Sequence, residues 1–115
     1  PYAFLIADDA APDALRIGYP YFQYGEPMRF DEPGDYADPA AQTQHSVTYE
    51  WTHGFAEILD PLLEAGLRLD FLHEFPYTVE NYWATAFEEQ APGRYVLRGR
   101  PDVLPLMFSL RATRP

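Results

Sequence analysis

The sequence predicts an α+β or partial α/β fold, with one main helix, a mixed sheet and an inserted β-hairpin. Three observations predict it. An amphipathic helical repeat runs from Thr52 to Gly66, and an alternating segment, 67–72, follows it at once. A second alternating segment, 104–112, closes the chain. A repeat of 3.6 residues gives a helix one apolar face, whereas a repeat of two gives a strand one apolar face.

The helix is the best-marked element. Apolar residues recur at the i, i+3, i+4, i+7 and i+8 spacing of a single helical face. These residues are Phe55, Ile58, Leu59, Leu62 and Leu63. Thr52 is the expected N-cap, and Gly66 is expected to end the helix with a positive φ. Pro61 falls on the polar face, where the bend that it introduces is tolerated.

Two strands flank this helix in the prediction. After it, Leu67, Leu69 and Phe71 alternate with polar residues, which predicts a strand through Leu72 or His73 with those three side chains on one face. Before it, residues 2–7 form a continuous apolar run, typical of a strand buried on both faces. A buried strand needs a neighbour on each side, so we expect further strands beyond these 115 residues.

The terminal strand also alternates. Leu106, Phe108 and Leu110 share one face of segment 104–112. The other face carries Met107, Ser109 and Arg111. Only one of the two faces is therefore apolar throughout, which is typical of a strand with one face on the core.

An aromatic insert occupies residues 10–51. Its prolines exclude a long helix or a central strand; they are Pro12, Pro20, Pro27, Pro33 and Pro39. Met28–Asp31 and Ser46–Trp51 are expected to pair as a hairpin around a long loop, 32–44. In the second of these strands Val47, Tyr49 and Trp51 lie on one side.

The remaining segment, 76–103, is predicted as a loop with a short helix. Helical turns within 79–89 would turn Tyr82, Trp83 and Phe87 inward, and 94–98 is expected to form a short strand. The chain is thus predicted as a single, partial domain. Its parts are an inner strand at 1–9, the insert at 10–51, a helix–strand unit at 52–75, the loop at 76–103 and the antiparallel strand at 104–115.

Composition excludes several classes of function. The net charge is −10, and all eight basic residues are arginine, so phosphate backbones and anionic membranes repel the chain. No cysteine is present, which excludes disulfides and cysteine-based zinc sites. No apolar run reaches the roughly eighteen residues of a membrane span. We therefore expect neither nucleic acid nor membrane as a partner, and the cytoplasm as the compartment.

Five segments carry a resemblance to a known family. They are Thr48–His53, Leu63–Leu67, Phe71–Pro76, Pro105–Ala112 and, in the insert, Tyr36–Pro39. Taken together in chain order, the five segments resemble the C-terminal half of bacterial class I S-adenosylmethionine-dependent methyltransferases, the methyltransferase-domain proteins. The resemblance implies a Rossmann-like seven-stranded sheet in which residues 2–7, 67–72 and 104–112 are the fifth, sixth and seventh strands. The seventh would lie antiparallel between the other two.

The resemblance also implies that the cofactor and the acceptor are bound by different halves of the full-length protein. The family binds its cofactor through a glycine-rich turn after the first strand, and this chain contains no two glycines separated by one residue. S-adenosylmethionine is therefore expected as the cofactor of the full-length protein, and none for this chain alone. The chain would be the acceptor-side C-terminal fragment of an enzyme acting on a small molecule, inactive by itself. The alternative is a non-catalytic α+β binding or dimerisation domain.

Four residues are predicted to bind the acceptor: Tyr21, Tyr49, Trp51 and His53. The last three approach the start of the helix, a usual place for functional side chains, and His53 could act as a base or a hydrogen-bond donor. Tyr49 and Trp51 could instead be core aromatics. Tyr21 lies among Tyr19, Phe22 and Tyr24, which could form an acceptor site, a dimer contact or part of the insert's own packing.

No catalytic, cofactor-binding or metal-binding residue is assigned. Asp8 and Asp9 end the first strand and are either acceptor or metal contacts or a solvated strand end. The three histidines, His45, His53 and His73, lack the spacing of a metal site. Because residues 2–7 would present an apolar edge, we expect the chain to form a homodimer through that exposed sheet edge, or to swap elements.

Overall fold

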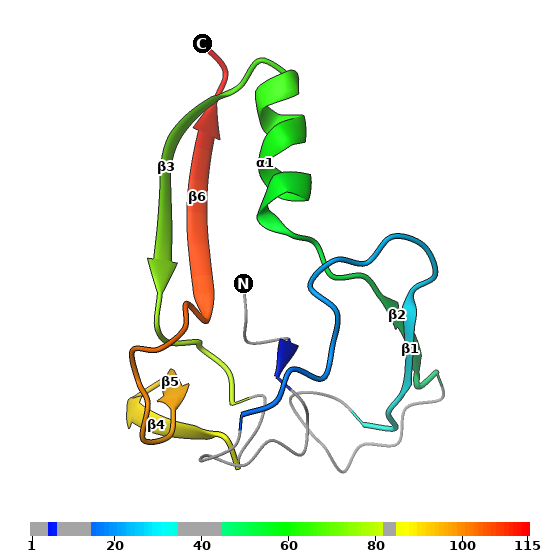
Figure 1. Cartoon of the computed structure of the whole chain (residues 1–115), viewed down its shortest axis with the longest axis vertical. Helices are drawn as coiled ribbons and strands as arrows, with labels where there is room; N and C mark the ends of the chain where they lie inside the picture. The colour runs from blue at the N-terminus through cyan, green and yellow to red at the C-terminus, as the bar shows by residue number, and fades with distance from the viewer. Residues whose placement is uncertain (1–4, 7–14, 35–44, 82–84) are drawn as a thin grey trace. The chain divides into compact units, whose positions relative to one another are not determined.

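The computed structural model describes residues 5–6, 15–34, 45–81 and 85–115, and these form one helix and six strands (Figure 1). In chain order they are β1 (Met28–Asp31), β2 (Val47–Glu50), α1 (Phe55–Glu64), β3 (Arg68–Phe75), β4 (Phe87–Ala91), β5 (Arg94–Leu97) and β6 (Met107–Thr113). The predicted α+β class is confirmed.

The chain forms two compact units. The main unit comprises Pro1–Tyr21 and Gly54–Pro115, and the hairpin unit comprises Phe22–His53. The hairpin unit holds β1 and β2, and the main unit holds the helix and the other four strands.

The strands of the described residues pair two by two, always antiparallel: β1 with β2, β3 with β6, and β4 with β5 (Figure 1). The predicted hairpin is confirmed, with Met28 opposite Glu50 and Asp31 opposite Val47. The predicted antiparallel pairing of the strand after the helix with the terminal strand is also confirmed.

The expected pairing of residues 2–7 with the terminal strand is not found at the two of these residues that the structure describes. Ile6 instead forms an antiparallel bridge with Ile17, and the Gly18 N–H donates to the Leu5 carbonyl at 2.8 Å. The chain therefore returns alongside its own beginning. Leu5 and Ile6 are 5% and 1% exposed. The expectation that this segment presents an uncovered apolar edge is therefore wrong for these two side chains.

Gly54, and not the predicted Thr52, is the N-cap of α1. Its backbone is extended (φ −71°, ψ 163°), and its N–H donates to the Glu57 carboxylate at 3.2 Å. The next N–H, that of Phe55, donates to the Tyr21 hydroxyl at 3.0 Å. Thr52 is engaged elsewhere, because its N–H donates to Gln23 Oε1 at 2.9 Å. Two side chains thus satisfy N–H groups that a helix start leaves unbonded.

The end of α1 follows the prediction. Gly66 has a φ of 76°, and its N–H donates to the Leu63 carbonyl at 2.9 Å. The Leu67 N–H donates to the Leu62 carbonyl at 3.1 Å. This pair of bonds is a Schellman motif, which needs the left-handed conformation that glycine adopts without strain.

A β-bulge at Asp70 changes the faces of β3 from those predicted. Leu69 lies opposite Ala112 and Phe71 opposite Arg111, so Asp70 is an extra residue in the ladder. Neighbouring residues of β6 point to opposite faces, and Leu69 and Phe71 therefore do so too. The expectation that they share a face is wrong, because a one-residue insertion reverses every side chain that follows it.

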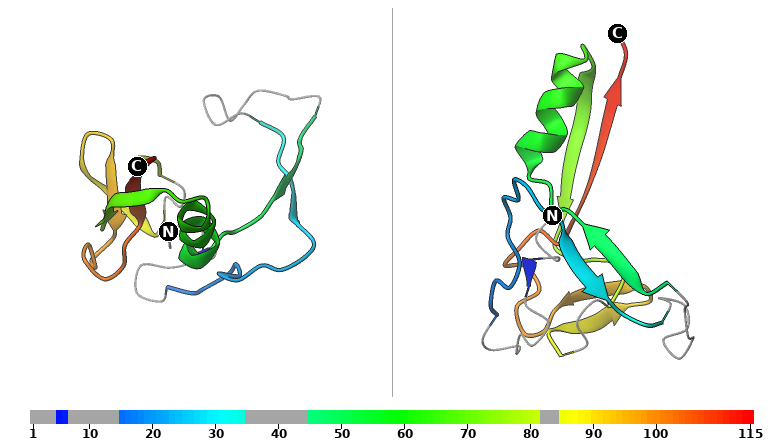
Figure 2. Two further views of the ribbon diagram at one scale, coloured as in Figure 1. Left: turned by 90° about the horizontal axis from the view of Figure 1, so that it is seen from above. Right: turned by 90° about the vertical axis from the view of Figure 1, so that its right-hand side faces the viewer.

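The helix covers only one face of the β3–β6 pair (Figure 2). The Phe55 ring meets the edge of the Phe108 ring at 5.0 Å, and Leu72 and Leu110 lie opposite each other on the same face of the sheet as Phe108. No residue of α1 is fully buried, and Leu63 is 54% exposed. Two strands thus leave much of the helix's apolar side uncovered within the described part of the main unit.

The core of the main unit lies away from the helix. Its buried members are Ile6, Ala86, Phe87, Leu97 and Leu106, with Leu15, Tyr95 and Leu104 packed against them. Phe87 and Leu97 face each other across the β4–β5 hairpin, whose turn contains Gly93 at a φ of 68°.

This hairpin corrects the predicted short helix. Phe87–Glu89 belong to β4, because Phe87 pairs with Leu97 and buries its ring in the core. The inward orientation of Phe87 and the short strand expected at 94–98 are confirmed. Tyr82 and Trp83 lie outside the described residues.

Candidate functional site

The hairpin unit exposes the aromatic side chains predicted to bind the acceptor. Tyr49, in β2, is 57% exposed, and Trp51, which directly follows β2, is 49% exposed. Neither is a core aromatic, so that alternative is wrong. Exposed tyrosine and tryptophan offer flat apolar area together with a polar atom, the combination common at binding surfaces.

Local hydrogen bonds position these side chains. Trp51 Nε1 donates to the Gly25 carbonyl at 3.2 Å, which fixes the indole against the segment before β1. Gln23 Oε1 accepts both the Thr52 N–H and the Thr52 hydroxyl, at 2.9 and 3.3 Å. The residues that follow β2 are therefore held to the residues that precede β1.

The other end of the hairpin carries a charged contact. The Ser46 hydroxyl donates to Asp31, and Arg29 Nη2 lies 3.2 Å from the same carboxylate. The hydrogen bond from Ser46, followed by that from Arg29, lowers the pKa of Asp31 below its ordinary value of 3.8.

The four predicted site residues are divided between the units. Tyr49, Trp51 and His53 belong to the hairpin unit, and His53 is exposed at its end. Tyr21 belongs to the main unit, where its hydroxyl accepts the Phe55 N–H and its ring lies against Gly54: a Cβ added there would be 3.0 Å from Tyr21 Cε1. This structural role accounts for Tyr21 without a substrate, whereas acceptor binding by all four residues stays a prediction.

The other polar candidates do not gather into a site. Asp8 and Asp9 lie outside the described residues. His45 precedes β2, and His73 lies in the middle of β3. Within residues 5–6, 15–34, 45–81 and 85–115, no three side chains of the metal-ligating types come together. No helix in that same part of the chain has the length and apolarity that a membrane crossing requires.

Sequence reasoning missed a row of aromatic side chains in the main unit, which we call the aromatic column: Phe71, His73, Phe75 and Tyr77. Phe71 and His73 stack with ring centroids 4.6 Å apart at 11°. His73 meets Phe75 at 6.4 Å, and Phe75 meets Tyr77 at 5.4 Å. Phe71, His73 and Phe75 lie opposite Arg111, Ser109 and Met107, on the face of the sheet away from Phe108.

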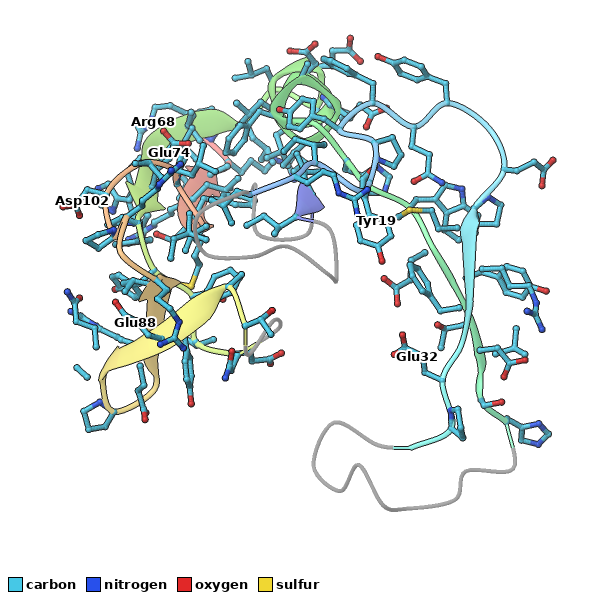
Figure 3. All side chains as sticks on the ribbon, turned by 60° about the horizontal axis from the view of Figure 1, so that its bottom comes forward. Tyr19, Glu32, Arg68, Glu74, Glu88 and Asp102 are labelled. Atoms are coloured by element: carbon cyan, nitrogen blue, oxygen red, sulfur yellow. The ribbon has the colours of Figure 1, made fainter. Side chains whose placement is uncertain are left out.

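Arginines stand at both ends of the aromatic column. The Arg94 guanidinium lies 4.3 Å from the Tyr77 ring centroid, a cation–π contact. At the other end, Arg68 and Arg111 lie 3.0 and 3.4 Å from the two oxygens of Asp70 (Figure 3 labels Arg68). These two arginine side chains are 70% and 66% exposed. Three of the eight arginines of an acidic chain therefore flank one aromatic surface.

The signal for the aromatic column is present in the sequence. Aromatic or imidazole side chains occupy every second position from Phe71 to Tyr77. Extending the Leu67–Leu69 alternation through Asp70 assigns Phe71 to the helix side and hides the pattern. The bulge at Asp70, which the contacts of its carboxylate stabilise, is what places Leu69 and Phe71 on opposite faces of β3.

Comparisons of the chain with protein-family models, with curated proteins and with solved structures found no match. A functional proposal therefore depends on the residues and contacts described above.

Proposed function

We propose that residues 1–115 are the acceptor-side part of a Rossmann-like S-adenosylmethionine-dependent methyltransferase that acts on a small molecule. One observation carries the proposal: α1 leads directly into β3, and β3 pairs antiparallel with the terminal strand β6. The family resemblance implies this order for the last helix and the sixth and seventh strands.

The incomplete covering of α1 supports the same proposal. Helices of α/β folds pack on a sheet wide enough to cover their apolar stripe. Here no residue of α1 is fully buried and Leu63 is 54% exposed. A further strand beside β6 would extend the sheet beneath the helix. The resemblance gives that place to residues 2–7, but here Ile6 bridges Ile17 instead, so the proposal needs either a rearrangement of residues 2–7 or a strand from outside this chain.

The start of α1, the one helix in the described residues, does not fit the cofactor. Rossmann-like folds bind their nucleotide at the start of a helix, where free N–H groups and glycines allow close approach. At the start of α1 the N–H of the N-cap residue, Gly54, donates to Glu57, and the first N–H of the helix, that of Phe55, donates to Tyr21. Gly54, which precedes the helix, has an ordinary φ of −71°. We accordingly assign S-adenosylmethionine to residues outside this chain.

On this proposal the hairpin unit supplies acceptor contacts. Tyr49 and Trp51 would pack against an apolar acceptor, and His53 would accept its proton or donate a hydrogen bond to it. Methyl transfer requires chiefly that acceptor and donor be aligned. Aromatic side chains on a hydrogen-bonded hairpin are suited to that task, because they offer large rigid surfaces.

Calorimetric titration with S-adenosylhomocysteine tests the proposal. The titrated proteins are residues 1–115 alone and the product of the complete reading frame that contains them. We expect one site in the complete product and no heat of binding for residues 1–115. Binding by residues 1–115 alone, or none by the complete product, would contradict the proposal.

The exposed aromatic residues of the hairpin unit favour a second candidate, a non-catalytic binding or dimerisation domain. The reading frame distinguishes the two. A glycine-rich strand–turn–helix encoded upstream of Pro1 supports the transferase, whereas a stop codon and a start site next to Pro1 support the binding domain.

A further inference from the structure

The aromatic column has the composition of an interaction surface. Phe71 is 37% exposed, although it is part of a continuous row of ring contacts that ends at Arg94. Phe71 and His73 are exposed on this face, and Phe75 and Tyr77 are half-buried. Aromatic and arginine side chains contribute most of the binding energy at protein interfaces, chiefly where they are packed together.

Arginine side chains flank this surface in a chain that is acidic overall. Arg68, Arg94 and Arg111 flank it, with Asp70 as the carboxylate between two of them. The chain as a whole carries a net charge of −10. A cationic surface on an acidic protein attracts acidic partners, which it orients during encounter.

The hairpin unit has the complementary composition. Its described carboxylates, Glu26, Asp31, Glu32 and Glu50, are all exposed, and Arg29 is its one arginine. Its aromatic side chains are exposed as well: Phe22 by 62%, Tyr24 by 79%, Tyr49 by 57% and Trp51 by 49%. A two-stranded hairpin alone is marginally stable in water, so an apolar surface against which to pack would stabilise it.

We propose that the aromatic column binds the hairpin unit of a second copy of this chain. Each copy carries one acidic aromatic hairpin and one arginine-flanked aromatic face, and in the proposed dimer two copies exchange both contacts around a twofold axis. Such an interface closes on itself and stops at a dimer. This dimer differs from one formed through a sheet edge, because side chains of a sheet face make the contact. It does not require methyltransferase activity, but a dimer that covers Tyr49 and Trp51 would compete with an acceptor for these two side chains.

Paired charge reversals test the proposal. Arg94→Glu places a carboxylate beside Tyr77 without touching the contacts of Asp70. Glu26→Arg places a cation next to Gly25, whose carbonyl holds Trp51. In sedimentation velocity experiments, each substitution alone should raise the dimer dissociation constant at least about tenfold, an effect of about 1.4 kcal/mol. An equimolar mixture of the two variants should form a heterodimer, because the reversed charges attract one another in it.

Two further variants complete the test. Phe71→Thr keeps a strand-forming residue, removes the ring and should weaken the dimer by a similar factor. Arg100→Glu reverses an exposed arginine after β5 and is the matched control, which should leave the constant within about twofold once long-range charge is screened by 0.15 M salt. Circular dichroism spectra that match the parent protein establish that each variant is folded.

The outcomes are distinct. Weakening by Arg94→Glu and Glu26→Arg, with recovery in their mixture, supports the reciprocal contact. A parent protein that stays monomeric up to millimolar concentration overturns the proposal. A dimer that all three substitutions leave unchanged overturns it equally, since its interface would lie elsewhere.

Discussion

Deletion of Asp70 should leave the β3–β6 ladder in register, although deleting a residue within a strand normally reverses the faces that follow. Asp70 is the extra residue between Leu69, opposite Ala112, and Phe71, opposite Arg111. Without it, Leu69 and Phe71 become ordinary neighbours that still point to opposite faces. Every other pair along the two strands is kept.

The cost of this deletion is limited to the contacts of Asp70. Its carboxylate accepts a hydrogen bond from Arg68 Nε at 3.0 Å and one from the Thr113 hydroxyl at 3.3 Å, and it lies 3.4 Å from Arg111 Nε. Both arginines are mostly exposed, so each ion pair contributes about 0.2–1 kcal/mol, and the hydroxyl about as much. We expect the free energy of unfolding to fall by about 1–2 kcal/mol.

Deletion of His73 is the matched control. It removes a residue from the regular part of the ladder, where His73 pairs with Ser109. The side chains of β3 on one side of the deletion then point to the opposite face of the sheet. Leu69 and Leu72 are half-buried on the helix face, so moving both to solvent costs about 1.5–3 kcal/mol, roughly half the value of two fully buried leucine side chains. Losing the stacked ring adds to that cost.

Denaturant unfolding followed by circular dichroism measures both free energies, and nuclear Overhauser contacts between the methyl groups of Leu72 and Leu110 report the register. The Asp70 deletion should keep these contacts. If it destabilises the chain as much as the His73 deletion, or abolishes the contacts, the bulge does not separate the two faces of β3.

The capping and hairpin contacts give three further expectations. Tyr21→Phe removes the acceptor of the Phe55 N–H and should lower the free energy of unfolding by about 1 kcal/mol; an unchanged melting temperature would argue for a role outside the fold. Gly54→Ala places a Cβ 3.0 Å from Tyr21 Cε1, so the ring must move. Tyr21→Ala should therefore lower the free energy of unfolding less in the Gly54→Ala variant than in the parent protein. Equal losses in the two backgrounds would contradict the contact. The pKa of Asp31 is lowered in the folded chain, so its contacts stabilise the hairpin above pH 3.8 and are lost as the pH falls through the folded-state pKa. Ser46→Ala should raise that pKa towards 3.8, as measured by carboxyl-carbon titration, and an unchanged pKa would contradict the assigned cause.

The elements that the sequence predicts well are those whose signal is local. The apolar spacing of Phe55–Leu63 and the glycine at position 66 determine α1 and its end, whatever packs against them. The β1–β2 hairpin is likewise bounded by its own residues, and its strands were predicted to within one residue at each end. Local periodicity and turn chemistry suffice for such elements.

The errors arise where distant residues decide. Thr52 has an N-cap side chain, but Gln23 binds it, while Tyr21, remote in sequence, caps the helix at Gly54. The bulge at Asp70 depends on Arg111 and Thr113, which come some forty residues later in the chain. The residues next to Asp70 in the sequence do not indicate a bulge, and for that reason the faces of β3 and the aromatic column were not predicted.

The β4–β5 hairpin was missed for a related reason. Phe87 and Leu97 pair across a turn and are buried in one cluster with Ile6, from the other end of the chain. Short apolar stretches are ambiguous between helix and strand until such a partner is known. The spacing of aromatic residues in 79–89 fits helical turns equally well.

Amide hydrogen exchange along β6 tests most directly whether α1, β3 and β6 form one edge of a larger sheet, on which the proposed function depends. The measurement compares residues 1–115 with the product of the complete reading frame. If β6 is an inner strand, those of its amides that do not bond to β3 should exchange rapidly in residues 1–115 and become strongly protected in the complete product. If they exchange equally fast in both, β6 has no second neighbour, and the methyltransferase proposal loses its structural basis.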